Sequence, residues 1–389
     1  MLTVITHLEI LIYLLISPVI RLFFDEAVDY NYYFLIFFIF YMGYVISIYF
    51  PFRLKGCNRE HQVVINFTLP GKLVAIVFAC LYIYISIKNG IVNRRLGTES
   101  MAVIFANLGL FDLAVLRIQE ICFPIMLAFS LRVFISPTKI SFADYALLFF
   151  LLLSWTFSGA LFSRTAAIIN ILSVLLLLQN SISKAVIKKY SGIALGIGLL
   201  FFVVISAVRY YPNEEINTKE LMFSEFAKRS DGLELSSLIV NKYGYSIFGE
   251  TFSAWGPPII SAVPFLDEAK EFKENALTTA KSYILTEELD LPFKDYNSFV
   301  TTDLYLATGL FGLLVGGFLL GLFTKKFDAS IGLNNSRISY ALYAAFALNL
   351  MVMERDFSGI IIGTFRDFFI YYIFLCFLFS FGRKVYDQK

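Results

Sequence analysis

Arginine residues stand at the ends of several long apolar blocks in this sequence. Arg164 lies in the short turn Ser163–Thr165 between two such blocks, and Arg209 closes the last block before a long polar stretch. Because a guanidinium group binds phosphate oxygens through two parallel hydrogen bonds, these arginines predict a phosphate or pyrophosphate site with Arg164 and Arg209 in catalytic roles. The other basic candidates for binding the substrate are Arg94, Arg95, Arg229 and Arg355.

A simpler interpretation is that each arginine anchors an apolar block at a membrane surface or pairs with a neighbouring acid. Arg355 fits that interpretation well, because Glu354 and Asp356 flank it. Arg164 fits it less well, since so short a turn has little reason to hold a charge. Arg366 and Asp367 lie inside a later apolar block, where we expect them to pair.

Carboxylates near the same membrane face could act as a general base, which takes the proton from an attacking hydroxyl. Glu250, in the stretch FGETFSAWG, is the catalytic candidate. Asp303 opens an apolar block, where a helix N-terminus favours negative charge in any case. We therefore place Asp303 among the residues that bind substrate.

Four aromatic residues could stack on the faces of sugar rings beside this site: Tyr243, Tyr245, Trp255 and Tyr305. Tyrosine and tryptophan also populate membrane interfaces without any such role. The chain holds only two histidines, and its four cysteines show no paired spacing, so we expect neither a metal site nor a cofactor. The small net charge of +2 argues against a nucleic-acid partner.

The elements that must position these residues are membrane-spanning helices. Of 389 residues, 58% are hydrophobic and only 16% are charged, and the apolar residues come in blocks of about 20, the length that crosses about 30 Å of hydrocarbon. We predict an all-α polytopic membrane protein with about ten spans. They lie near 3–23, 31–50, 72–88, 118–135, 143–162, 165–183, 191–210, 302–324, 338–354 and 359–381.

The polar stretch divides the chain into three parts. These are a seven-span bundle (1–210), a large loop with amphipathic and re-entrant helices (211–300), and a three-span segment (301–389). Lysine and arginine are more frequent in the loops that share a side with the N-terminus, so we expect both termini inside and the large loop outside. The closely spaced glycines from Gly309 to Gly321 favour helix packing over catalysis.

Several of these features occur together in one known family. The Ser-Arg-Thr turn, the arginine before a large outer loop and the Gly-Glu pair of that loop precede Asn297-Ser298-Phe299 and the stretch from Asp303 to Gly312, DLYLATGLFG. In this combination the chain resembles the Wzy-type polymerases of O-antigen repeat units, most clearly over 155–325. Some members carry an arginine followed eleven residues later by glycine in two outer loops, a pattern that no arginine here shows.

The resemblance implies a metal-independent glycosyltransferase of the bacterial inner membrane that acts in lipopolysaccharide or other polysaccharide biosynthesis. Such an enzyme transfers a glycan from undecaprenyl diphosphate to an incoming lipid-linked repeat unit at the periplasmic face. The implied partners are undecaprenyl-diphosphate-linked oligosaccharides, the lipid bilayer and a chain-length regulator.

Three alternatives remain open. A flippase for lipid-linked sugars is expected to have two similar halves, and these halves differ. An O-antigen ligase resembles the same family, but ligases use a histidine in the large outer loop, which has none here. A sensor or scaffold would not need so many arginines at one membrane face.

Overall fold

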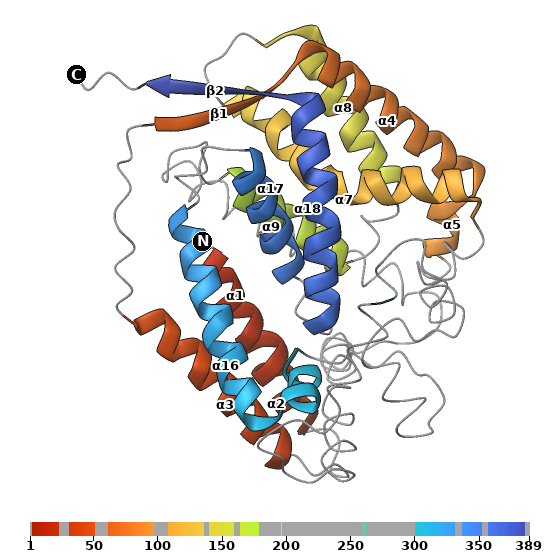
Figure 1. Ribbon diagram of the computed structural model, residues 1–389. Coiled ribbons are helices and arrows are strands. Elements are labelled where there is room, and N and C mark those ends of the chain that lie inside the picture. Colours follow the sequence, from red (N-terminus) through yellow and green to blue (C-terminus); the bar gives the residue numbers. More distant parts are fainter. Residues whose placement is uncertain are drawn as a thin grey trace. The chain divides into compact units, whose positions relative to one another are not determined.

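Helices make up almost all of the regular structure (Figure 1). The computed structural model describes residues 2–22, 31–50, 61–96, 108–135, 140–158, 164–178, 300–330, 337–351 and 357–385, and the single residues 196 and 260. Within these ranges, five helices are long and apolar enough to cross a membrane: Leu2–Ile20, Leu69–Lys88, Leu110–Ile135, Val300–Asp328 and Ile360–Leu378. Shorter apolar helices cover Tyr33–Tyr49, Phe142–Phe157 and Ile169–Leu178. The prediction of an all-α membrane protein is confirmed at this level.

The predicted spans that fall within the described residues coincide with helices. The span predicted at 191–210 and the loop predicted at 211–300 lie almost wholly outside those residues. The chain forms two compact units, which interleave along the sequence. Unit 1 comprises Met1–Gly56, Asn217–Ser330 and Ala345–Arg366, and unit 2 comprises Cys57–Ile216, Ile331–Ala344 and Asp367–Lys389.

Unit 1 is built around α16 (Val300–Ser330), which is not one straight helix. Gly309 interrupts it with φ 68° and ψ −165°, a conformation that is essentially restricted to glycine. Leu304 and Gly316 would be about 18 Å apart in a straight helix, yet a Cβ atom added to Gly316 would overlap the Leu304 side chain. A short limb (300–308) therefore folds back along a long limb (310–330). The span that we predicted at 302–324 therefore contains a break at Gly309, which was not predicted.

The long limb packs closely against α3 (Asn31–Tyr49) through glycines. A Cβ atom at Gly317 would overlap the backbone carbonyl of Phe40, and one at Gly43 would overlap the carbonyl of Leu314. A Cβ atom at Gly321 would overlap the Ser47 hydroxyl. The two backbones are thus in contact, as in other membrane helix pairs with small residues at the interface. The predicted packing role of the glycines is confirmed at Gly317 and Gly321.

Two side chains at the end of the long limb cap the neighbouring helices. The Asp328 carboxylate accepts hydrogen bonds from the backbone N–H groups of Leu2 and Thr3, each at 2.8 Å, at the start of α1 (Leu2–Leu11). The Lys325 ammonium donates to the carbonyls of Ile48 and Phe50, each at 2.8 Å, at the end of α3. Both contacts satisfy backbone groups that a helix leaves unpaired at its ends. They also show that α3 runs parallel to the long limb and α1 antiparallel to it.

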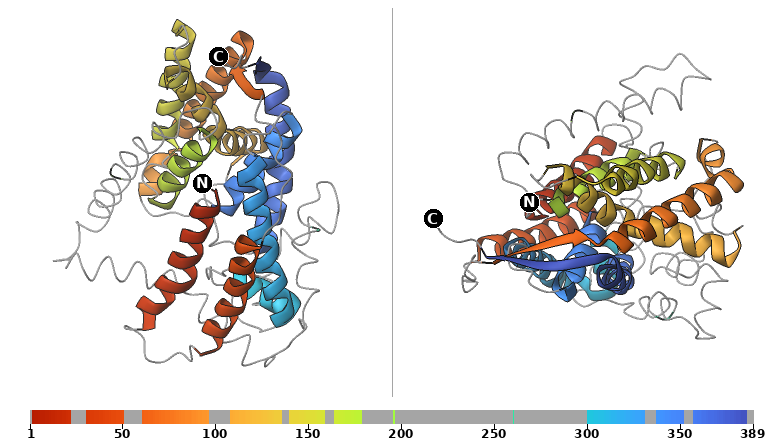
Figure 2. Two further views of the ribbon diagram at one scale, coloured as in Figure 1. Left: turned by 90° about the vertical axis from the view of Figure 1, so that its left-hand side faces the viewer. Right: turned by 90° about the horizontal axis from the view of Figure 1, so that it is seen from above.

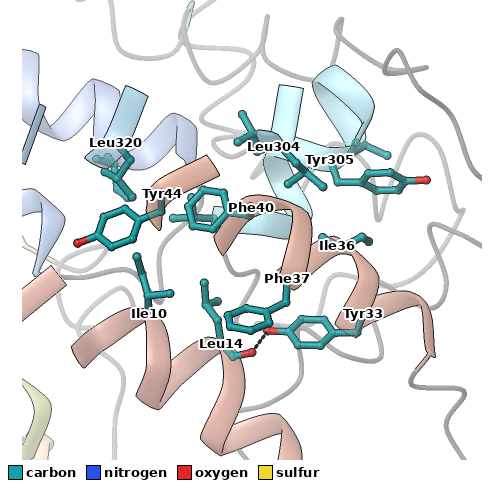
Figure 3. Packing of buried hydrophobic residues seen from close by; sticks show 14 of the residues in the cluster. Ile10, Leu14, Tyr33, Ile36, Phe37, Phe40, Tyr44, Leu304, Tyr305 and Leu320 are labelled. Carbon is teal, nitrogen blue, oxygen red and sulfur yellow. Dashed lines mark hydrogen bonds between the residues drawn. The ribbon is translucent and has the colours of Figure 1, made fainter. Parts of the chain in front are cut away.

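The core of unit 1 lies between these helices (Figure 3). After α1 the chain continues as a π-helix, η1 (Ile12–Ile16), and as α2 (Ser17–Leu22). The Tyr33 hydroxyl donates to the Leu14 carbonyl at 2.8 Å, which gives a polar group inside this core its partner. The labelled residues of the core come from α1, η1, α3 and both limbs of α16: Ile10, Leu14, Tyr33, Ile36, Phe37, Phe40, Tyr44, Leu304, Tyr305 and Leu320.

Unit 2 contains three helices whose directions are set by contacts at their ends. Lys72 of α4 (Leu69–Lys88) forms an ion pair with Asp144 of α8 (Phe142–Phe157), so both helices begin at the same end and run parallel. Ser141 and Asp144 form a capping box at the start of α8. Helix α7 (Leu110–Ile135) lies between α4 and α8 in the sequence and runs in the opposite direction to both.

Helix α7 begins before the position that we predicted. Residues 110–117, which we assigned to an outer loop, form its first two turns and carry Asp112 and Arg117. The ion pair of Lys88 with Asp112 ties the first turn of α7 to the end of α4. Apart from Asp112 and Arg117, these two turns are apolar, as expected of a helix that continues into the predicted span.

A two-stranded antiparallel ladder was not predicted. Strand β1 (His61–Phe67) pairs with β2 (Phe379–Val385), which follows α18 (Phe357–Leu378), and the two strands lie side by side in Figure 2. The Thr68 N–H group donates to the Leu378 carbonyl at 3.0 Å beside the ladder. Helix α4 therefore begins at the point where α18 ends. Unit 2 also contains the first part of α17 (Arg337–Leu350).

We expect Gly317→Leu to destabilise unit 1 because the new side chain cannot fit between the backbones of α3 and the long limb. Overpacking of this kind costs about 1–3 kcal/mol or more. The measurement is the thermal unfolding of the purified protein in detergent. Val315→Leu is the matched control, because Val315 lies on the exposed side of the same helix. Equal unfolding temperatures for the two variants would contradict the packing described above.

Candidate functional site

The double arginine Arg94–Arg95 lies on a short helix, α5 (Ile91–Leu96), directly after α4. Gly90 makes the turn between the two helices with φ 59°, a left-handed conformation common at helix ends. Ile91 is buried and packs in one cluster with Tyr82 and Ile85 of α4 and with residues of α7. This anchor holds α5, and with it the two arginines, at the end of α4.

Polar contacts fix the same end of α4 to the start of α7. The Lys88 ammonium lies 3.0 Å from the Asp112 carboxylate. The Asn89 amide donates to that carboxylate at 3.3 Å and to the Ile85 carbonyl at 2.9 Å. An ion pair this exposed contributes little stability. The ion pair instead fixes the position of the end of α4 beside the start of α7, and so the level at which α5 leaves the helix bundle.

Arg164 is the first residue of α9 (Arg164–Leu178), which packs against α7. Because α8 runs parallel to α4, it ends at the end of unit 2 that carries Lys88, and α9 begins after a short connection from there. We call this the arginine end of unit 2: the ends of α4 and α8, the starts of α7 and α9, and α5. Arg94, Arg95 and Arg164 all belong to it.

The arginine end combines two sources of positive potential. One is the set of three guanidinium groups, which remain charged at every physiological pH. The other is the start of α9, where backbone N–H groups without intrahelical partners favour an anion. Chemically, such an end can bind a phosphate or diphosphate group and stabilise negative charge on it.

Asp303 and Tyr305 lie in unit 1, on the short limb of α16. Both are buried, with 2% and 3% of their surface exposed. Tyr305 is part of the hydrophobic core, and Thr301 and Thr302 beside Asp303 are equally buried. Asp303 thus lies in the first turn of its helix, as we expected, but in a buried position that the sequence did not indicate. Its carboxylate is an ionisable group inside the helical unit, a position where such groups are commonly functional.

The remaining predicted site residues lie outside the described residues: Arg209, Arg229, Tyr243, Tyr245, Glu250, Trp255 and Arg355. The structure thus brings together Arg94, Arg95 and Arg164 in unit 2, and Asp303 and Tyr305 in unit 1. In α18, Arg366 is exposed and its neighbour Asp367 is buried.

No group of three or more His, Cys, Asp or Glu side chains that could hold a metal ion occurs within the described ranges. In that part of the chain, Cys80, Cys122 and Cys376 are free thiols. The part of the site that can be described is therefore made of arginines and backbone N–H groups.

Uncharged polar residues were missed by reasoning that searched for charges. Gln119 of α7 and Ser154 of α8 are buried, with 2% and 1% of their surface exposed, and they meet inside unit 2. The signal for them is an amide and a hydroxyl within otherwise apolar blocks.

Comparison of the chain with protein-family models, curated proteins and solved structures gave no match.

We expect Ile91→Ala to loosen α5, because a buried isoleucine truncated to alanine loses about 2–5 kcal/mol of packing. The measurement is limited trypsin digestion of the purified protein, with cleavage after Arg94 and Arg95 followed by mass spectrometry. Cleavage should be several-fold faster in Ile91→Ala. Asn93→Ala, at an exposed position of the same helix, is the control. Equal rates for the variant and the wild type would show that Ile91 does not anchor the two arginines.

Proposed function

We propose that this chain is a polymerase for lipid-linked oligosaccharides. It joins repeat units carried on undecaprenyl diphosphate into an O-antigen or related surface polysaccharide, at the periplasmic face of the bacterial inner membrane. The observation that carries the proposal is the arginine end of unit 2, where Arg94, Arg95 and Arg164 gather at one end of the helices. A transferase that releases a diphosphate carrier needs cationic groups at that membrane surface.

The reaction assigns a task to each class of residue. A hydroxyl oxygen of the incoming repeat unit attacks the anomeric carbon of the growing glycan, and a carboxylate takes the hydroxyl proton. The bond between that carbon and the diphosphate oxygen breaks, and undecaprenyl diphosphate leaves with the electron pair. Arginines stabilise the charge that develops on the leaving group. We assign this role to Arg164 and Arg209, diphosphate binding to Arg94 and Arg95, and the base to Glu250.

The directions of helices in unit 1 support the proposed ten-span topology. Residue 50 and the end of the long limb lie at the same end of unit 1, because Lys325 caps α3 there. The long limb therefore starts at the opposite end, and the chain between residues 51 and 309 must cross the membrane an odd number of times. The five spans proposed between 72 and 210 meet this requirement, and four would not.

Unit 2 supplies an independent requirement. Helix α4 begins where α18 ends, so the chain from 69 to 378 must cross the membrane an even number of times. The eight spans proposed there satisfy it. The excess of lysine and arginine in the loops on the side of the N-terminus then favours two cytoplasmic termini and a periplasmic arginine end.

The span proposed at 191–210, the last of the five between residues 72 and 210, is the most informative to test. A green fluorescent protein fused after residue 186 should fluoresce, since we place that position in the cytoplasm. Alkaline phosphatase fused after residue 214 should be active, because it folds only on the periplasmic side. If the fusions at residues 186 and 214 report the same side of the membrane, the span at 191–210 does not exist and the proposed topology is wrong.

The strongest alternative is a flippase for lipid-linked sugars, and one observation in unit 1 favours it. Glu9 and Thr6 of α1 are buried, and the His7 ring contacts the rings of Tyr41 and Tyr44 at centroid distances of 5.7 and 5.9 Å. Ionisable groups inside membrane helices often serve proton pathways in transporters. A polymerase has no evident need of them at this position.

Surface polysaccharide from cells that lack the gene distinguishes these functions on a gel. Loss of the ladder to core plus a single repeat unit supports a polymerase, whereas loss of every repeat unit supports a flippase or a ligase. An unchanged ladder would exclude all three. Restoring the gene on a plasmid is the control.

In the same cells, Arg164→Ala and Arg209→Ala should abolish long chains, because neutral side chains cannot stabilise the leaving diphosphate. Both proteins should remain inserted and abundant on immunoblots. Lys326→Ala serves as the control, since it removes an exposed charge from the long limb of α16. Normal chain lengths in both arginine variants would refute the catalytic assignment.

A further inference from the structure

A layer of uncharged polar side chains crosses unit 2 between α7 and α8. The Gln119 amide nitrogen donates to the Ser154 hydroxyl at 3.4 Å, and this hydroxyl donates to the Leu151 carbonyl at 2.8 Å. Trp155 follows Ser154 on α8, and its ring lies 5.8 Å from that of Phe123, one turn after Gln119 on α7. Gln119, Ser154 and Trp155 therefore occupy one place in the unit, which we call the polar layer.

Two atoms of the polar layer have no hydrogen-bond partner among the described residues. They are the Gln119 side-chain oxygen, an acceptor, and the Trp155 indole nitrogen, a donor, and both atoms are buried. A buried polar group left unpaired costs about 1–3 kcal/mol. One donor and one acceptor, on facing helices and within about one turn of each other, suit a neutral ligand that offers both, rather than an ion.

The polar layer lies just inside the arginine end. Helices α7 and α8 are antiparallel, with Gln119 beside Ser154 at one level and Phe134 beside Tyr145 at another. Ser154 is less than one turn from the end of α8 at Phe157, and the chain then leads to Arg164. A ligand held by the arginines through a diphosphate would thus place its next group towards the polar layer.

Helix α18 passes the same level of α7. The Tyr371 hydroxyl donates to the Ile121 carbonyl at 2.9 Å, and the ring of Phe379 lies 4.9 Å from that of Phe129. One turn before Tyr371, Asp367 is buried with 6% of its surface exposed. Helix α18 therefore packs against α7 close to the level of Gln119.

We propose that the polar layer is a binding subsite for the sugar that adjoins the diphosphate of the lipid-linked oligosaccharide. A hydroxyl or acetamido group of that sugar accepts a hydrogen bond from the Trp155 indole and donates one to the Gln119 amide oxygen. The indole also offers an apolar face, as sugar sites commonly do. The inference rests on the proposed polymerase function and deepens it, because it assigns residues to the sugar as well as to the diphosphate.

Fluorine NMR on the full chain tests this subsite. The chain holds two tryptophans, so labelling with 5-fluorotryptophan gives two signals, and the signal that disappears in Trp155→Phe belongs to Trp155. The probes are the lipid-linked repeat unit extracted from cells lacking the gene and undecaprenyl diphosphate without sugar. The Trp155 signal should shift with the first probe and not with the second. Equal shifts with both probes, or no shift in protein that binds the first, would overturn the subsite.

Binding affinities of matched variants separate a ligand role from a structural one. Trp155→Phe keeps an aromatic ring, though a smaller one, and removes the donor, and Gln119→Leu removes the acceptor. Each should weaken binding of the lipid-linked repeat unit about 5- to 10-fold, the effect of one hydrogen bond of about 1 kcal/mol, and leave binding of undecaprenyl diphosphate unchanged. Unfolding temperatures should change little, because each variant removes an unpaired buried polar atom, and Gln119→Leu gives up only the long 3.4 Å hydrogen bond to Ser154 besides.

Ser130→Ala is the control. The Ser130 hydroxyl is also buried and without a partner among the described residues, but it lies three turns further along α7. Its loss should change neither affinity. Wild-type affinity in both Trp155→Phe and Gln119→Leu would mean that the layer holds only internal water and would refute the subsite. A wild-type protein that binds neither probe would instead refute the proposed function.

Discussion

The contact between the backbones of α3 and the long limb of α16 is the constraint on which unit 1 depends. Without side chains at Gly43 and Gly317, each helix reaches the carbonyl groups of the other. Lipid offers no hydrophobic driving force between apolar helices, so close packing of this kind must supply much of the association. Lys325 and Asp328 add direction to it, since they cap α3 and α1 from one end of the same limb.

In unit 2 the helices are aligned by ion pairs rather than by close packing of their backbones. Its helices are aligned by contacts at their ends, Lys72 with Asp144 at one end and Lys88 with Asp112 at the other. A polar contact near a membrane surface needs no desolvation of a charge deep in lipid, and it still sets the vertical register of the helices. That register brings α5 and the start of α9 to the same end. The pair Arg94–Arg95 and the distant Arg164 therefore belong to one end of unit 2.

Long apolar blocks were sufficient to predict where helices occur, and glycine spacing was sufficient to predict close packing. The fold-back at Gly309 was not predictable, because a glycine that breaks a helix and a glycine that packs it look alike in the sequence. The β1–β2 ladder joins segments from opposite ends of the chain, which no local pattern indicates. Of the candidate site, charge pointed to Arg94, Arg95 and Arg164, whereas the depth of Asp303 and the meeting of Gln119 with Ser154 depend on tertiary packing.

If the chain binds a lipid-linked glycan as we propose, the arginine end and the polar layer divide its recognition between charge and neutral hydrogen bonds. A diphosphate keeps its charge and its hydration at the membrane surface, where guanidinium groups can meet it without being taken out of water. A sugar is neutral, so its hydroxyl groups can be drawn below that surface if every one finds a partner. Buried ionic partners there would pay a large desolvation cost, whereas an amide and an indole do not. A site of this design recognises the carrier by charge and the glycan by neutral hydrogen bonds, so the two can be selected separately.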